Sequence, residues 1–281
     1  MTSPAISAAS SSSARPERTV PAPALWQRLA ASPVFRPVAT FLVVLLVWEG
    51  AARLLAIPSF VLPAPSRIAE GFSSIPPGRW FEHVWATLRV ALIGYAVSIL
   101  VALPIAMALT RSKFMSDSFY PLLVVIQSTP VVAVAPIIIV ALGSGDAPRI
   151  VITFLITFFP LVVSMTTGMQ ATPGELIELS RSLRAPAWRE FTHIRIPYAI
   201  PYIFSGLKIS ITLAVIGAVV AEFVAAEKGI GFFIQFSTSM FQVPQAWAGL
   251  AILVVMSLAL FQAVSVSQRL FFPWSLPKGN R

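Results

Sequence analysis

The stretch WATLRVALIGYAVSILVALPIAMAL, from Trp85 to Leu109, contains a single charged residue, Arg89. A helix crosses the hydrocarbon core of a bilayer in about 20 residues, and its backbone polar groups must bond to one another because no water is there. The stretch is long enough for this, and it lacks the alternation of polar and apolar residues that marks a strand of a membrane barrel. It therefore predicts a membrane-spanning α-helix.

Five further apolar runs of similar length occur on either side of this stretch. Hydrophobic residues make up 57% of the chain and charged residues only 11%, whereas soluble domains carry about a quarter charged residues. The sequence thus predicts an all-α, polytopic membrane protein with six transmembrane helices. We expect the spans at Val38–Ile57, Trp85–Leu109, Phe119–Leu142, Ile150–Gly168, Tyr202–Ala226 and Trp247–Phe272.

The net charge of +9 comes from Lys and Arg residues that lie mostly between the apolar runs. Nucleic-acid binding needs such residues clustered on a folded polar surface, which this pattern does not provide. Basic residues next to membrane spans instead mark the cytoplasmic side of a membrane protein. Their distribution predicts that both termini and the loop from Met169 to Pro201 are cytoplasmic.

The spans and loops divide the chain into four expected parts. Residues 1–37 form a tail that is rich in Ala, Ser and Pro, and we expect it to be disordered because it has few large apolar side chains. Residues 38–83 comprise the first span and an extracytoplasmic loop. Residues 84–273 form the core transmembrane domain with the cytoplasmic loop 169–201, and residues 274–281 form a cytoplasmic tail.

Glycine and proline mark two further features of the core. The sequence GSGDAP at Gly143–Pro148 predicts a short turn that makes the third and fourth spans an antiparallel pair. Prolines inside spans break or kink a helix; broken helices often line the pathway of a transporter, but kinks in merely packed helices are about as common. The prolines concerned are Pro104, Pro130, Pro136 and Pro160.

The loop after the fourth span is too regular to be a linker. Residues 171–201 read ATPGELIELSRSLRAPAWREFTHIRIPYAIP. A capping box of Thr172 and Glu175, with Pro173 at the first helical position, predicts the start of a helix that runs to Arg184.

Three apolar residues of this helix, Leu176, Leu179 and Leu183, recur at helical spacing. A second short helix is expected from Ala187 until Pro197. Two short amphipathic helices that project from a membrane domain can be an anchor in the lipid headgroups or a docking site for a soluble partner. The residues alone leave these two alternatives open.

The same loop resembles the EAA loop of bacterial binding-protein-dependent ABC importers, whose pattern is Glu-Ala-Ala, three residues, Gly, nine residues, Ile, one residue and Leu-Pro. Residues Glu178–Ser180 stand at the Glu-Ala-Ala places, Ile194 at the Ile place, and Ile196–Pro197 at the Leu-Pro place. Arg184 stands where the pattern has Gly. If the turn there is left-handed, Arg costs roughly 1 kcal/mol relative to Gly.

Two more stretches, Pro121–Gly145 and Phe204–Ile234, are similar to permeases of the nitrate, sulfonate, taurine and pyrimidine-precursor uptake group. The resemblance implies a type I ABC importer fold, with the chain as the permease subunit in a bacterial inner membrane. It implies a homodimer of six-span subunits, two cytoplasmic ATPase subunits and an extracytoplasmic substrate-binding protein. The residues expected to dock the ATPase are Leu176, Glu178, Leu179, Ser180, Arg181, Leu183, Arg184, Ile194 and Pro197.

The chain itself is expected to be no enzyme and to need no cofactor. It has no G-x-x-x-x-G-K-[ST] loop for a nucleotide, and it has no cysteine. His83 and His193 have no second ligand at metal spacing, and we expect both at the surface.

Polar residues inside the apolar runs are candidates for a substrate pathway, because such residues are costly in a bilayer. The alternative is hydrogen bonding between helices, or, for Glu222, a partner such as water or Lys228. The candidates are Gln127, Ser128, Thr129, Thr153, Thr157 and Glu222.

Two alternative functions stay open. The first is a self-sufficient secondary transporter or channel, and the second, which the sequence favours less, is a membrane-embedded enzyme. The first would show an inverted internal repeat or a buried ion-coupling cluster, and the second a motif such as G-x-S-x-G; neither is seen in the sequence. The expected solute is a small nitrogenous molecule such as a thiamine-type pyrimidine precursor. Nitrate, sulfonate and taurine are the alternatives.

Overall fold

The computed structural model of the protein describes residues 35–276, and all regular structure in that range is helical. The expected tails, residues 1–37 and 274–281, lie mostly outside the described residues. The elements are α2 (Phe35–Leu54), α3 (Pro65–Ser73), α4 (Pro77–Arg111), α5 (Lys113–Ser128), α6 (Val131–Leu142), α7 (Asp146–Gln170), α8 (Gly174–Ser182), α9 (Ala187–Glu190), the π-helical turn η1 (Phe191–Arg195), α10 (Ile196–Ala225), α11 (Ile230–Ser239), α12 (Val243–Phe271) and the 3-10 turn η2 (Pro273–Ser275).

Five helices in the described part of the chain are long and apolar enough to cross a membrane. They are α2, α4, α7, α12 and the continuous helical run Ala187–Ala225, in which α9 and η1 lead into α10. A sixth span results if α5 and α6 are counted as one. The all-α, polytopic membrane fold that the sequence predicts is therefore confirmed.

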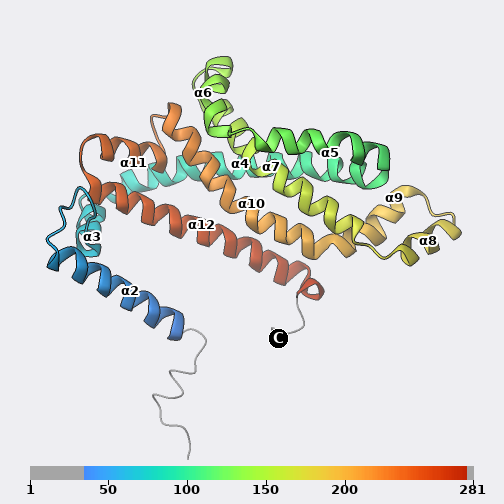
Figure 1. Ribbon diagram of the computed structural model, residues 1–281, viewed down its shortest axis with the longest axis horizontal. Helices are drawn as coiled ribbons and strands as arrows, with labels where there is room; N and C mark the ends of the chain where they lie inside the picture. The colour runs from blue at the N-terminus through green and yellow to red at the C-terminus, as the bar shows by residue number, and fades with distance from the viewer. Residues whose placement is uncertain (1–34, 277–281) are drawn as a thin grey trace, which may run out of the picture. The chain divides into compact units, whose positions relative to one another are not determined.

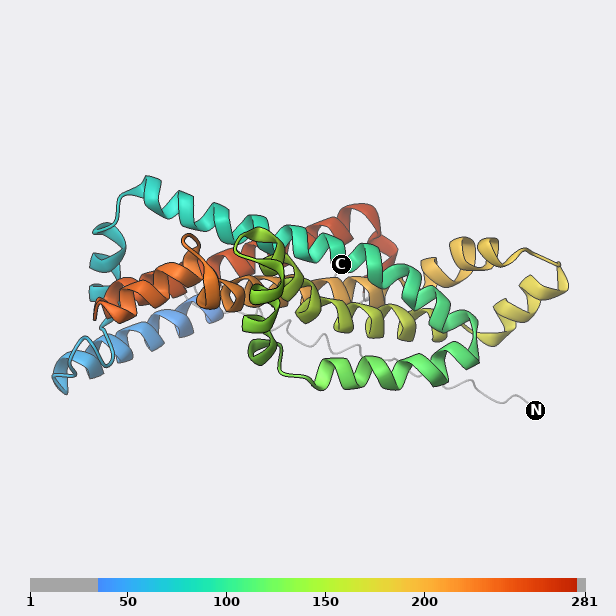
Figure 2. The ribbon, with the colours of Figure 1, turned by 90° about the horizontal axis from the view of Figure 1, so that it is seen from above.

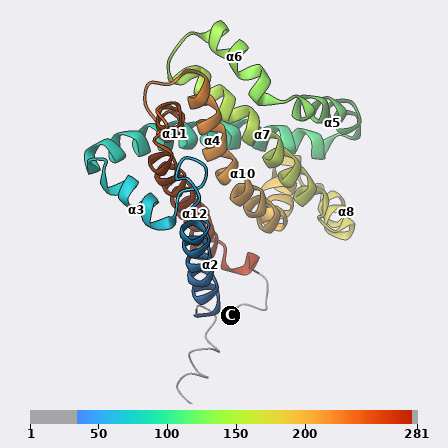
Figure 3. The ribbon, with the colours of Figure 1, turned by 60° about the vertical axis from the view of Figure 1, so that its left-hand side comes forward.

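The third expected span, Phe119–Leu142, is not one helix but two. α5 and α6 meet at an angle of 90°, a bend that is visible in Figures 1 and 3. Pro130 has no N–H to donate, and it disfavours the helical conformation of the residue before it, so Thr129 is extended with φ −76° and ψ 124°. Pro104, Pro136 and Pro160, by contrast, lie inside continuous helices.

The chain divides into two compact units between Ala51 and Ala52. In the described part of the first unit, the side chains of α2 are largely exposed, with Phe41 63% and Leu46 70% exposed. A helix that is apolar on every side and exposed is suited to contact with lipid. The second unit holds the packed core.

In the core of the second unit, α7 packs against both α4 and α10, and small residues bring the helices close together. A Cβ atom at Gly94 would lie 2.6 Å from Cγ2 of Thr153, and one at Gly217 would lie 2.9 Å from Cα of the same threonine. Close approach through small residues is how helices gain packing contacts in a bilayer, where lipid is as apolar as the side chains.

The two ends of the second unit carry different elements. Figures 1 and 2 show α8 and α9 at one end and α3 and α11 at the other. Toward the α8 end, Met165, Met169 and Phe191 are buried in one apolar cluster. Toward the α11 end, Trp80 and Phe233 are buried in a second one. The spans thus separate two packed ends, and each end presents its own candidate site.

Candidate functional site

The loop expected to dock a partner is a short helix, a turn and a helical run into α10. α8 begins with Pro173 as its N-cap, and Oγ1 of Thr172 is buried without a hydrogen-bond partner among the described residues. The predicted capping box is therefore wrong. The predicted end of the second helix at Pro197 is also wrong, because Pro197 falls in the first turn of α10, where a residue without an N–H is tolerated.

The turn after α8 is left-handed, as a glycine at this place would favour. Arg184 has φ 51°. Its N–H donates to the carbonyl of Arg181 at 2.9 Å, and the N–H of Ala185 donates to the carbonyl of Ser180 at 3.0 Å. This pair of bonds is the Schellman motif that ends many helices.

α8 presents a row of apolar side chains to its surroundings. Leu176 is 41% exposed, Leu179 55% and Leu183 74%. On the adjacent face of the helix, Ile177 and Ser180 are buried. Of the remaining predicted docking residues, Ile194 is half-buried and the others are exposed: Glu178, Arg181, Arg184 and Pro197. Ser180 therefore belongs to the packing of the loop itself, while the other eight are accessible.

The base of the loop is tied to the end of α7 by one arginine, which sequence reasoning did not single out. Nε of Arg195 donates to Oε1 of Glu190 at 2.6 Å, and its Nη1 donates to the carbonyl of Met169 at 3.3 Å. The latter carbonyl lies in the last turn of α7, where the helix dipole favours a cation. Phe191 is buried in the same apolar cluster as Met169, so the base of the loop packs against both α7 and α10.

The pathway candidates fall in two different environments. Gln127, Ser128 and Thr129 are exposed at the break between α5 and α6. Thr153 and Thr157 are fully buried between helices, and Oγ1 of Thr157 lies 2.5 Å from Oγ of Ser98 in α4. The structure therefore gives the two buried threonines the alternative role, hydrogen bonding and packing between helices.

Comparison with known proteins fits this architecture. The family described as "Binding-protein-dependent transport system inner membrane component" matches residues 94–275. The chain belongs to this family. It is thus a multi-pass permease component of an ATP-driven importer in the inner membrane, and not an enzyme.

Relatives of this permease carry several substrate names. It is 32% identical to the riboflavin transport system permease protein RibX of Chloroflexus aurantiacus, over 84% of this chain and 88% of the relative. It is 31% identical to the formylaminopyrimidine transport permease protein ThiX of Halalkalibacterium halodurans, over 85% and 95%. It is also 30% identical to the nitrate import permease protein NrtB of a Synechocystis strain, over 72% and 76%.

A solved structure of the MetNI methionine ABC transporter shares the fold of the permease. Its chain superimposes with a TM-score of 0.60 at 19% identity, covering 66% of the permease and 93% of the solved chain. At this identity the similarity concerns the fold alone.

The other end of the permease holds Glu222, and its environment differs from the one expected. Glu222 is 1% exposed, and its Oε2 accepts the N–H of Gly231 at 2.7 Å. The alternative partner, Lys228, instead donates to Glu82 at 2.5 Å. The proposed Lys228 pairing is therefore wrong, and Glu222 caps the N-terminus of α11.

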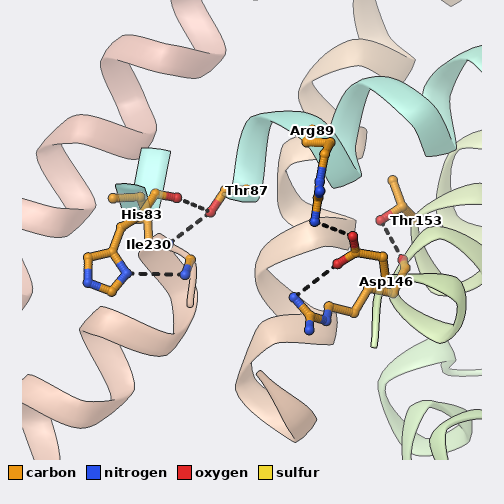
Figure 4. Close-up of polar contacts among 8 residues, drawn as sticks. His83, Thr87, Arg89, Asp146, Thr153 and Ile230 are labelled. Atoms are coloured by element: carbon orange, nitrogen blue, oxygen red, sulfur yellow. Dashed lines mark hydrogen bonds and ion pairs between the residues drawn. The ribbon is translucent and has the colours of Figure 1, made fainter. Parts of the chain in front are cut away.

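Two side chains of α4 complete this cap, as Figure 4 shows. Oγ1 of Thr87 accepts the N–H of Ile230 at 2.8 Å, and Nδ1 of His83 accepts the N–H of Gly229 at 3.2 Å. His83 is only 4% exposed, so its expected surface position is wrong. The error has a simple cause: α4 begins at Pro77, before the apolar run starts, and this places His83 inside the helix.

An ion cluster lies where α4 passes the start of α7. Arg89 pairs with Asp146, and Nη1 of Arg149 lies 3.5 Å from Oδ1 of the same aspartate (Figure 4). Asp146 is in the first turn of α7, where the helix dipole favours a carboxylate. The cluster explains why Arg89, the one charge in the run Trp85–Leu109, is tolerated there.

Proposed function

We propose that α8 and the turn at Arg184 dock a separate cytoplasmic ATPase subunit, whose hydrolysis drives transport through this permease. The observation that carries the proposal is the row of exposed leucines, Leu176, Leu179 and Leu183. Buried in a partner's groove, such side chains act as anchors, and truncating an anchor typically costs about 2 kcal/mol or more of binding. Because the sequence has no nucleotide loop, the energy of ATP has to reach the chain through contact.

The proposal includes the orientation and the partners of the permease. The loop 169–201 and both termini are cytoplasmic, and an extracytoplasmic substrate-binding protein meets the opposite end, near α3 and α11. A second copy of the chain completes the transporter. In support of the second copy, none of the residues of α5 is buried within the single chain, and this helix carries the exposed Gln127 and Ser128. These two residues and Thr129 then face the pathway between the copies.

The proposed solute is a small nitrogenous heterocycle. Two relatives, at 32% and 31% identity, are named for riboflavin and formylaminopyrimidine, and others, at 25–30% identity, for nitrate, taurine and aliphatic sulfonates. A binding protein selects the solute, so the direct test is the affinity of the partner binding protein for a pyrimidine, riboflavin, nitrate and taurine. Affinity for sulfonates alone would refute the heterocycle.

Co-purification of the ATPase subunit with the permease tests the docking surface. We expect Leu183→Glu to reduce both co-purification and solute uptake by tenfold or more, since about 2 kcal/mol exceeds the 1.4 kcal/mol of one decade. Ser182→Glu is the matched control, because it puts the same charge on an exposed neighbouring position outside the leucine row. Equal amounts of each variant in the membrane exclude a folding defect. Full co-purification and uptake with Leu183→Glu would show that α8 is an interfacial anchor.

A further inference from the structure

A cavity of about 320 Å³ lies between the first turns of α4 and the helix α11. Figure 1 shows α11 at the end opposite to α8. Arg79 and His83 line it from α4, and Phe232, Phe236 and Ser237 line it from α11. Its volume is at the small end of the range for ligand pockets, about 300–1,000 Å³. It therefore suits a molecule, or a part of a molecule, of one or two rings.

Aromatic rings form much of the cavity wall. The rings of Phe232 and Phe236 stack with centroids 5.9 Å apart and planes 24° apart. The imidazole of His83 lies 6.3 Å from the Phe232 ring and 5.4 Å from the ring of Phe233. Stacking on such rings is available to any planar ligand, because every planar π-system has a face to offer.

The hydrogen bonds at the N-terminus of α11 hold the aromatic wall of the cavity in place, and they also determine which nitrogen of His83 is a hydrogen-bond donor. Nδ1 of His83 accepts the N–H of Gly229, so the proton of the neutral imidazole is on Nε2, which is then a donor. Nε2 of His83 and Oγ of Ser237 are buried, and neither has a hydrogen-bond partner among the described residues. Buried polar groups normally have partners, so these two atoms call for a ligand that supplies them.

We propose that this cavity binds a small, planar heteroaromatic molecule that carries a ring nitrogen or carbonyl acceptor. The inference rests on the proposed function, because it makes the heterocycle the transported solute and the cavity its first site on the permease. The rings of Phe232 and Phe236 hold the plane of the ligand. Nε2 of His83 donates to its acceptor, and Ser237 gives or takes a second hydrogen bond. The site is preorganised, because α11 is held by side chains of both α4 and α10.

Binding of formylaminopyrimidine to the purified full-length permease in phosphatidylcholine nanodiscs tests the site. We expect saturable binding to the wild type, a loss of about tenfold or more in affinity for Phe236→Ala, and a smaller loss for Ser237→Ala. Phe241→Ala is the matched control and keeps wild-type affinity, because Phe241 is 81% exposed in the turn after α11 and does not line the cavity. Taurine, which has no ring, does not compete.

Three outcomes would overturn the inference: equal affinity of Phe236→Ala and wild type, competition by taurine, or a lipid that native mass spectrometry finds on the wild type but not on Phe236→Ala. Uptake assays in cells separate this inference from the proposed function. Uptake of the pyrimidine without binding to the isolated permease would refute the proposed site but not the proposed solute. Binding at the site without uptake would refute the proposed solute but not the proposed site.

Discussion

Single residues decide how the docking end of the permease is built. Arg184 holds the left-handed backbone of the Schellman turn, which an L-residue with a side chain adopts at a cost of about 1–2 kcal/mol. The same residue is exposed beside Leu183 in the proposed docking surface. A glycine at position 184 would remove the backbone strain, but it would also remove the guanidinium. Arginine therefore makes the turn less stable than glycine would, and it supplies a positive charge that can face the partner.

We predict that Arg184→Gly makes the end of α8 more stable, because glycine adopts a positive φ without steric cost. The gain of roughly 1 kcal/mol corresponds to an about fivefold smaller population of the locally open state, and amide hydrogen exchange in α8 would slow accordingly. Arg184→Ala is the control: it removes the same charge but keeps a Cβ, so exchange should remain close to wild type. Equal slowing in both variants would assign the effect to the lost charge.

Glu222 shows how a buried acidic side chain can stabilise the start of a helix. A carboxylate in an apolar span is expensive unless it is hydrogen-bonded, and the N-terminus of a helix offers both N–H groups and a favourable dipole. Gly229, in the turn before α11, has φ +126°, and a Cβ there would overlap the Glu222 carboxylate. The absence of a side chain at Gly229 therefore lets the carboxylate and the start of α11 approach each other.

At the scale of the elements, the proposed docking role requires a firm connection between the loop and the spans. The run α9, η1 and α10 is continuous, and Arg195 bridges Glu190 to the last turn of α7. The side chains of Arg195 and Glu190 are 13% and 15% exposed, so solvent and salt screen this pair less than a surface pair. The base of the loop is thus joined to both α7 and α10.

We predict that Arg195→Ala uncouples docking from transport. The ATPase should still co-purify, because the leucine row of α8 is unchanged, while solute uptake falls because the tie between the loop and α7 is lost. Arg195→Lys should recover uptake only in part, since a single ammonium group cannot reproduce both bonds of the guanidinium fork. Joint loss of co-purification and uptake in Arg195→Ala would mean that the pair merely supports the fold of the loop.

For the molecule as a whole, the sequence predicted the fold class and the placing of most spans, because long apolar runs have few alternatives in a bilayer. The sequence marked four prolines inside spans as possible breaks, but it did not predict which of them would end a helix; the structure has the 90° break at Pro130. The sequence also did not predict that His83 is buried, because α4 begins with a polar turn before the apolar run. Contacts such as the one between Arg195 and Met169 join residues from different elements, and no local sequence pattern predicts them.

The orientation of the whole chain is the last prediction, and it decides whether the docking end faces ATP. The excess of Lys and Arg in the segments next to the spans predicts that the α8 end lies in the cytoplasm and that α11 faces outside. The chain has no cysteine, so Ser182→Cys in α8 and Ser239→Cys at the end of α11 each introduce one exposed thiol. We expect a membrane-impermeant thiol reagent added to intact cells to label the α11 variant alone, and both variants after the cells are permeabilised. Labelling of Ser182→Cys in intact cells would show that the orientation is the reverse of the predicted one and that the leucine row of α8 lies on the side without ATP.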